Sequence, residues 1–144
     1  NELTAEWQER GVQQGKEYAI LTDEITKAWS GMTTRQYKKL KGLKKENLRD
    51  NMSTTELVLN MLAETSTKDI SAAVHPAGFE ESRRVARRGG EVAGIARKAL
   101  EEQTGALVVT SMKAADFHNL LTSIIEAAPA LIEEEDGEDT DNNE

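Results

Sequence analysis

The stretch STTELVLNML at 53–62 is the clearest helix start in the chain, and it decides the fold class. Ser53 is a preferred N-cap residue, and Glu56 follows three positions later, which is the spacing of a capping box. The apolar residues from Leu57 onward supply the face that such a helix buries. We therefore predict a helix over 54–65.

Helical spacing continues toward the N-terminus. Residues 2–13 place Leu3 and Trp7 one turn apart, and 16–29 repeats apolar side chains at similar intervals. Gly31 follows the second segment, and glycine adopts the positive φ of a helix C-cap without a steric clash. Two helices are therefore expected before residue 31.

A short helix–turn–helix unit is predicted directly ahead of STTELVLNML. Thr33 or Thr34 can cap a helix that ends at Lys41, and Gly42 turns the chain. Residues 44–52 then return to helical spacing. The apolar seam of this unit is expected to comprise Tyr37, Leu40, Leu43 and Leu48.

Beyond the predicted helix at 54–65, turn-forming residues and Pro76 indicate a surface connection over 66–78. A long helical pattern returns at 80–103, where the pair Gly89 and Gly90 favours a kink.

The last part of the chain contains one more predicted helix. The β-prone segment ALVVT at 106–110 has no strand with which to pair, so an extended connector is expected. Ser111 then starts a helix through about Ala127, which Pro129 stops. The fold class is therefore all-α, a single small domain of six or seven helices.

Charge separates this domain from its C-terminus. The whole net charge of −8 comes from the segment EEEDGEDTDNNE at 133–144, which holds eight acids and no base. A segment with that charge and without apolar residues cannot repay the entropy of ordering. We predict a helical domain over 1–132 and a disordered acidic tail over 133–144, which serves solvation or competes with nucleic acid for basic surfaces.

Composition excludes several classes of protein. The chain has no cysteine, so disulfides and thiol chemistry are absent. No run of eighteen apolar residues is present, which predicts a soluble, cytoplasmic protein with no membrane partner. The chain begins at Asn1 instead of methionine, so a further segment is expected upstream.

Nothing in the sequence indicates catalysis. His75 and His118 are the only histidines, and neither has a second ligand at metal-binding spacing. The glycines at 89, 90 and 94 lie in a helical pattern without the preceding strand that a phosphate-binding loop needs. We expect a non-enzymatic protein without cofactor or metal.

Basic residues gather in two places. Residues 33–52 carry seven bases against two acids, and a surface of this kind attracts phosphate without reading bases. The predicted nucleic-acid-binding residues are Arg35, Lys38, Lys39, Lys41, Lys44, Lys45 and Arg49. The alternative is a solvated face whose lysines only keep the helices soluble.

A secondary basic patch is formed by Arg83, Arg84, Arg87 and Arg88, which Glu80 and Glu91 can partly neutralise. On the same helix, the small residues Ala86, Gly90 and Gly94 form a ridge. The ridge favours close helix packing within the domain, with a contact between subunits as the alternative.

The chain also resembles a known family over about two thirds of its length. The resemblance lies in 17–71, above all in the run YKKLKGLKKENLRDNMSTTELVLNMLAE, and VARRGGEVAGIARKAL is loosely similar. These segments resemble the C-terminal half of the DNA damage-inducible protein D family. Full-length members carry an N-terminal domain like that of antirepressors, which is absent here.

The resemblance implies a bacterial or phage protein of the SOS DNA-damage response that acts near single-stranded DNA and its recombinase filament. It brings no catalytic residue. We expect a regulatory domain that binds nucleic acid, or such a filament, without sequence specificity. The alternative is a protein-interaction or homo-oligomerisation module, favoured by the small-residue ridge and the unpaired ALVVT segment.

Overall fold

The computed structural model describes residues 1–139, with side chains described through Pro129. Its elements are α1 (Glu2–Glu9), α2 (Lys16–Ser30), α3 (Thr34–Leu40), the 3-10 turn η1 (Arg49–Asn51), α4 (Thr54–Val74), α5 (Gly78–Thr104) and α6 (Ala114–Asp139). The described chain contains helices and no strand, which confirms the all-α class. None of the described helices is long and apolar enough to cross a bilayer.

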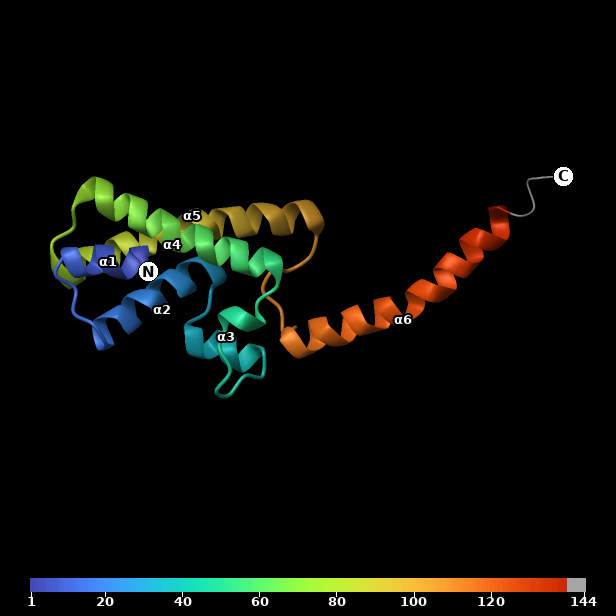
Figure 1. The fold of residues 1–144 in the computed structure, drawn as a ribbon. Helices are drawn as coiled ribbons and strands as arrows, with labels where there is room; N and C mark the ends of the chain where they lie inside the picture. The colour runs from blue at the N-terminus through green and yellow to red at the C-terminus, as the bar shows by residue number, and fades with distance from the viewer. Residues whose placement is uncertain (140–144) are drawn as a thin grey trace.

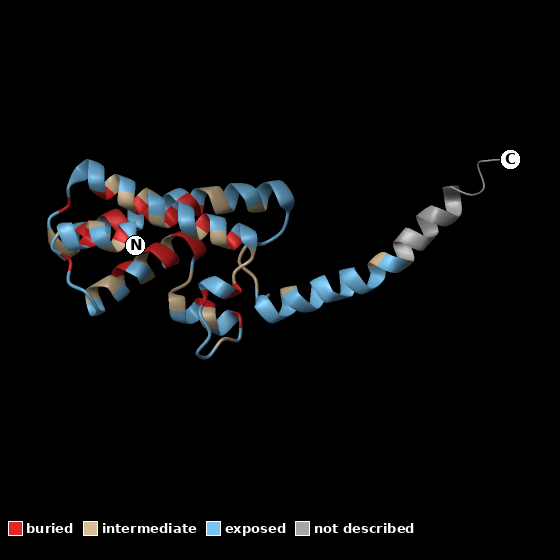
Figure 2. Ribbon diagram, viewed as in Figure 1, coloured by how far each residue is buried: buried red, intermediate tan, exposed pale blue. Residues whose placement is uncertain are grey.

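The helices α4 and α5 form an antiparallel hairpin, and α2 packs against both, with α1 beside α4 (Figure 1). Buried residues line the faces where these helices meet, whereas no residue of α6 up to Pro129 is buried (Figure 2). Trp29 and Tyr37 lie at the centre with their ring centroids 6.1 Å apart. The core therefore belongs to 1–104, and α6 stands outside it.

Several predicted helix ends are confirmed. Ser53 accepts from the amide of Glu56, and the Glu56 carboxylate accepts from the amide of Ser53, which completes the capping box. Thr33 caps α3, and Gly31 ends α2 at φ 83°. These ends depend on contacts within four residues, which is why they can be predicted locally.

The predicted helix over 44–52 is wrong, since only η1 forms there. Asn47 accepts from the amide of Asp50 with its side chain, and its carbonyl accepts from Asn51 Nδ2. Such local side-chain bonds compete with helical backbone bonds. Leu40 is also more exposed than the predicted seam requires.

The predicted surface connection over 66–78 is wrong for most of its length, because α4 continues to Val74. Its polar residues have partners: Thr67 Oγ1 donates to the Ala63 carbonyl, and Ser71 Oγ donates to Glu6 of α1. Pro76 lies after the helix, beyond the left-handed C-cap His75.

Pro129 does not stop the last helix, which begins at Ala114 and contains the proline. Proline removes one backbone hydrogen bond, and the carbonyl thus freed belongs to Ile125, which is exposed and can bind water. The predicted disordered tail covers 133–144. The side chains of these residues lie outside the described part of the structure, and from 140 onward the backbone does too.

The glycines of α5 allow close helix approach, and α5 runs through them as one helix where a kink was predicted. A Cβ on Gly90 would lie 2.5 Å from Ala28 Cβ and 2.7 Å from the Ile25 carbonyl oxygen of α2. A Cβ on Gly94 would lie 2.7 Å from the Ala28 carbonyl oxygen. The small-residue ridge therefore packs inside the domain, and the alternative of a subunit contact through it is wrong.

Candidate nucleic-acid interface

The seven bases predicted over 35–49 do not share one surface. Lys41 follows α3 directly and turns inward, so that only 2% of it is exposed. Its Nζ donates to Glu56 Oε1 at 2.9 Å and to the Thr110 carbonyl at 2.9 Å, and also to the Met112 carbonyl. The prediction that Lys41 binds nucleic acid is therefore wrong, because its charge is neutralised inside the fold.

Glu56 brings this buried cluster together. It lies in the first turn of α4, where its Oε1 also accepts from the Ser53 amide, while Oε2 accepts from the Tyr37 hydroxyl. Burial, and then the hydrogen bond to Glu56, raise the pKa of Tyr37 far above its usual range. The cluster ties α3, α4 and the connector after α5 to one another.

Arg49 is also separated from the lysines. It lies on η1, and its Nη1 donates to Glu64 Oε1 of α4 at 3.0 Å with about half of the side chain exposed. Asn60 donates to the same carboxylate oxygen at 2.7 Å. Arg49 therefore meets solvent with its charge partly neutralised.

The other bases gather around one groove. A hollow of 800 Å³ lies between α2 and α3, and four cations line it: Arg35, Lys38, Lys39 and Lys44. Lys45 follows on the exposed loop after α3. Asp23 is the one carboxylate among the lining residues, and its Oδ1 accepts from the Thr34 amide at 3.1 Å. We call this hollow the α2–α3 groove.

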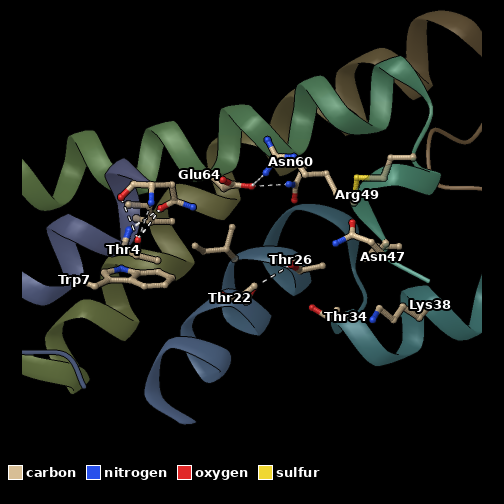
Figure 3. A pocket seen from close by; sticks show the side chains of 15 residues that line it. Thr4, Trp7, Thr22, Thr26, Thr34, Lys38, Asn47, Arg49, Asn60 and Glu64 are labelled. Atoms are coloured by element: carbon tan, nitrogen blue, oxygen red, sulfur yellow. Dashed lines mark hydrogen bonds and ion pairs between the residues drawn. The ribbon is translucent and has the colours of Figure 1, made fainter. Parts of the chain in front are cut away.

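A second pocket, of 330 Å³, adjoins this groove (Figure 3). Thr22, Thr34 and Lys38 line both hollows, while Trp7, Arg49 and Glu64 line only the second. Residues of α1, α2, α3 and α4 meet here from distant parts of the chain. Sequence reasoning missed this pocket because no local motif marks it.

The secondary basic patch is divided in the same way. Arg83 and Arg87 both bind Glu24 of α2, with distances of 2.9 Å from Arg83 Nη2 to Oε1 and 2.8 Å from Arg87 Nε to Oε2. The hydrogen bond from Arg87, followed by that from Arg83, lowers the pKa of Glu24. Arg84 and Arg88 are exposed, and neither pairs with a carboxylate among the described residues.

From the sequence we expected Glu80 and Glu91 to neutralise these arginines in part. The partner found is Glu24, about sixty residues earlier in the chain, as the hydrogen bond from Arg83 shows. No helical periodicity could have identified that pairing, since it depends on how α2 packs against α5.

The histidines lie apart from the α2–α3 groove. His75 caps α4 and His118 lies on α6, and both are exposed. Within the described part of the chain, no three His, Asp or Glu side chains are grouped as metal ligands.

Comparison with known proteins returned nothing: no family model, curated protein or solved structure matches the chain. The resemblance to the DNA damage-inducible protein D family stays a prediction from the sequence.

Proposed function

We propose that this chain is a non-enzymatic regulatory domain that binds the phosphate backbone of single-stranded nucleic acid without reading its bases. The observation that carries the proposal is the α2–α3 groove, in which four cations face one carboxylate. The residues proposed to bind are Arg35, Lys38, Lys39, Lys44 and Lys45.

Electrostatics supports this proposal. Lysines and arginines that neutralise phosphates release condensed counterions, which drives binding and makes it sensitive to salt. No aromatic side chain is among the residues that line the groove, so contact is expected through phosphates instead of stacked bases. Phosphate contacts position a nucleic acid but do not specify its sequence.

The resemblance to the DNA damage-inducible protein D family narrows the setting. It favours a bacterial SOS response and single-stranded DNA, either bare or within a recombinase filament. A groove that reads only the backbone suits a modulator of such a filament, because the filament forms on any sequence.

Binding of a labelled oligothymidine of about 30 nucleotides, measured by fluorescence anisotropy against salt concentration, tests the proposal. We expect the triple variant Lys38→Ala, Lys39→Ala, Lys44→Ala to bind more weakly. Its salt slope should fall by about 0.7 for each phosphate that the variant no longer neutralises.

The matched control is Lys16→Ala, Lys27→Ala, Lys98→Ala, which removes the same charge from exposed positions outside the groove. It should keep its affinity within about twofold, because distant surface charges are screened at physiological salt. An equal loss in both triple variants would show that net charge, and not the groove, determines binding.

The sequence features that favoured the alternative, a protein-interaction module, no longer support it. The small-residue ridge packs inside the domain, and Val108 and Val109 of the ALVVT segment pack against the core. The exposed apolar side chains of α6 now favour this alternative instead.

A further inference from the structure

The pocket that adjoins the α2–α3 groove has an apolar floor. Leu3, Trp7, Ile25 and Leu48 line it, and none of these four residues is more than 8% exposed. The volume of 330 Å³ lies at the lower end of the range for pockets that hold small organic ligands. The pocket therefore suits a group of modest size with apolar faces.

The polar side chains of α4 and η1 on the rim of this pocket are bonded to one another. Arg49 Nη1 and Asn60 Nδ2 both donate to Glu64 Oε1, at 3.0 Å and 2.7 Å. Asn60 Oδ1 in turn accepts from Trp29 Nε1 at 3.2 Å. Glu64 is the one carboxylate among the residues that line the pocket, and Arg49 pairs with it. An occupant would therefore be held mainly by apolar contact, with few hydrogen-bonding groups left to distinguish it from a similar molecule.

The pocket and the α2–α3 groove are continuous. Thr22, Thr34 and Lys38 line both hollows. Figure 3 shows Lys38 and Thr34 at one end of the pocket and Trp7 at the other. Lys38 therefore lies where the cationic surface of the groove meets the apolar surface of the pocket.

A nucleotide divides its chemistry in the same way, because one sugar joins a charged phosphate to a base with apolar faces. The cations of the groove do not by themselves select a single strand, since duplex and single strand both carry phosphates. A base can leave the strand and enter a pocket readily only where it is unpaired. The pocket therefore supplies the preference for single strands that the groove lacks.

We propose that this pocket receives one unpaired nucleobase of a single strand whose phosphates occupy the α2–α3 groove. The inference rests on the proposed function, because the groove has to hold the strand beside the pocket. It adds a contact that does not depend on charge. Because the rim side chains of α4 and η1 are bonded to one another, the pocket accepts the base without reading which base it is.

Two labelled strands of about 30 nucleotides test the proposal by fluorescence anisotropy. One is oligothymidine, and in the other an abasic sugar replaces every nucleotide's base. Both strands carry the same phosphates, so their electrostatic attraction to the groove is alike. We expect the parent protein to bind oligothymidine about tenfold more tightly than the abasic strand, with the same salt slope for both.

A pair of matched variants locates the preference. Thr22 and Asn47 are exposed and line the pocket, so Thr22→Leu, Asn47→Leu narrows it without changing its charge. This variant should bind oligothymidine no more tightly than the abasic strand. The control Thr55→Leu, Asn119→Leu makes the same substitutions at exposed positions outside the pocket, and it should keep the tenfold preference.

The groove variant Lys38→Ala, Lys39→Ala, Lys44→Ala should weaken binding of both strands. Its preference for oligothymidine should persist, because the apolar floor of the pocket is unchanged.

Photochemical cross-linking gives a second readout that needs no variant. 5-Iodouracil replaces thymine in the strand, and irradiation joins it to an adjacent aromatic or sulfur-containing side chain. We expect peptide mass spectrometry to find the products at Trp7 or Met52, which line the pocket. This readout decides the question even if the variant Thr22→Leu, Asn47→Leu does not fold.

The outcomes separate this proposal from the proposed function. Equal binding of the two strands by the parent protein, with the expected salt dependence, would overturn the base pocket and leave the groove in place. Binding of neither strand would overturn both. Cross-links found only outside the pocket, such as at Tyr18 or Phe117, would show that the bases lie elsewhere and would also overturn the base pocket.

Discussion

Lys41 Nζ lies 2.9 Å from Glu56 Oε1, and both side chains are fully withdrawn from solvent. Removing one member of a buried ion pair leaves an uncompensated charge, which costs about 3–5 kcal/mol. We therefore expect Lys41→Met to lower the free energy of unfolding by that amount in urea titrations followed by circular dichroism. Lys44→Met, on the exposed loop, should change it by less than about 0.5 kcal/mol.

The double variant Lys41→Met, Glu56→Gln checks the cause. A glutamine side chain at position 56 has no charge to leave unpaired and can still accept from the Tyr37 hydroxyl. The double variant should therefore lose clearly less stability than the two single variants added together. Simple additivity would mean that the two charges do not interact.

Gly90→Ala should destabilise the domain by about 1–3 kcal/mol or more. The added methyl group meets Ala28 Cβ and the backbone of Ile25, and backbone cannot move aside as a flexible side chain does. Thermal unfolding measures the effect. Glu91→Ala is the control on the neighbouring exposed position. Helix propensity favours alanine at both positions, so a similar loss in Glu91→Ala would contradict the packing explanation.

The two arginines around Glu24 make stability depend on pH. Because the folded-state pKa of Glu24 is lowered, its contribution is present above the unfolded pKa of about 4.5 and is lost as the pH falls through the folded value. Glu24→Gln should therefore be about 1 kcal/mol less stable than the parent near pH 7, and this difference should shrink as the pH falls below the unfolded value. Thermal unfolding over this range checks the sign, and a difference that grows toward acid would contradict it.

Ser53→Ala should cost about 1 kcal/mol, because the Glu56 amide loses the hydroxyl that caps it. Thr54→Ala, at the adjacent exposed position, is expected to be nearly neutral. Chemical denaturation of both variants measures the cap alone. Equal losses would show that Ser53 acts by something other than capping.

Local chemistry accounts for what could be predicted. The ends at Gly31, Thr33 and Ser53 depend on bonds within about four residues, so the sequence around each is sufficient. The failures share the opposite property. Thr67 and Ser71 look like turn residues until α1 and α5 pack against them, and Pro129 looks like a stop because proline usually ends a helix.

The candidate site divides in the same way. The sequence alone predicts that positive charge gathers over 35–49, and four of the seven predicted bases line the α2–α3 groove. The sequence does not predict which of the seven bases lie outside this groove. The partner of Arg49 lies fifteen residues away, and Lys41 reaches carbonyls about seventy residues later in the chain.

The amino-acid sequence was enough to establish an all-helical chain, most of its helix ends and the segments rich in positive charge, because these depend on neighbours along the backbone. Tertiary packing alone decided that Lys41 is buried, that Arg83 and Arg87 bind Glu24, and that α6 presents an uncovered apolar face. Helical periodicity tells which side of a helix a charge occupies. Only the arrangement of the other helices tells whether water or a carboxylate meets it there.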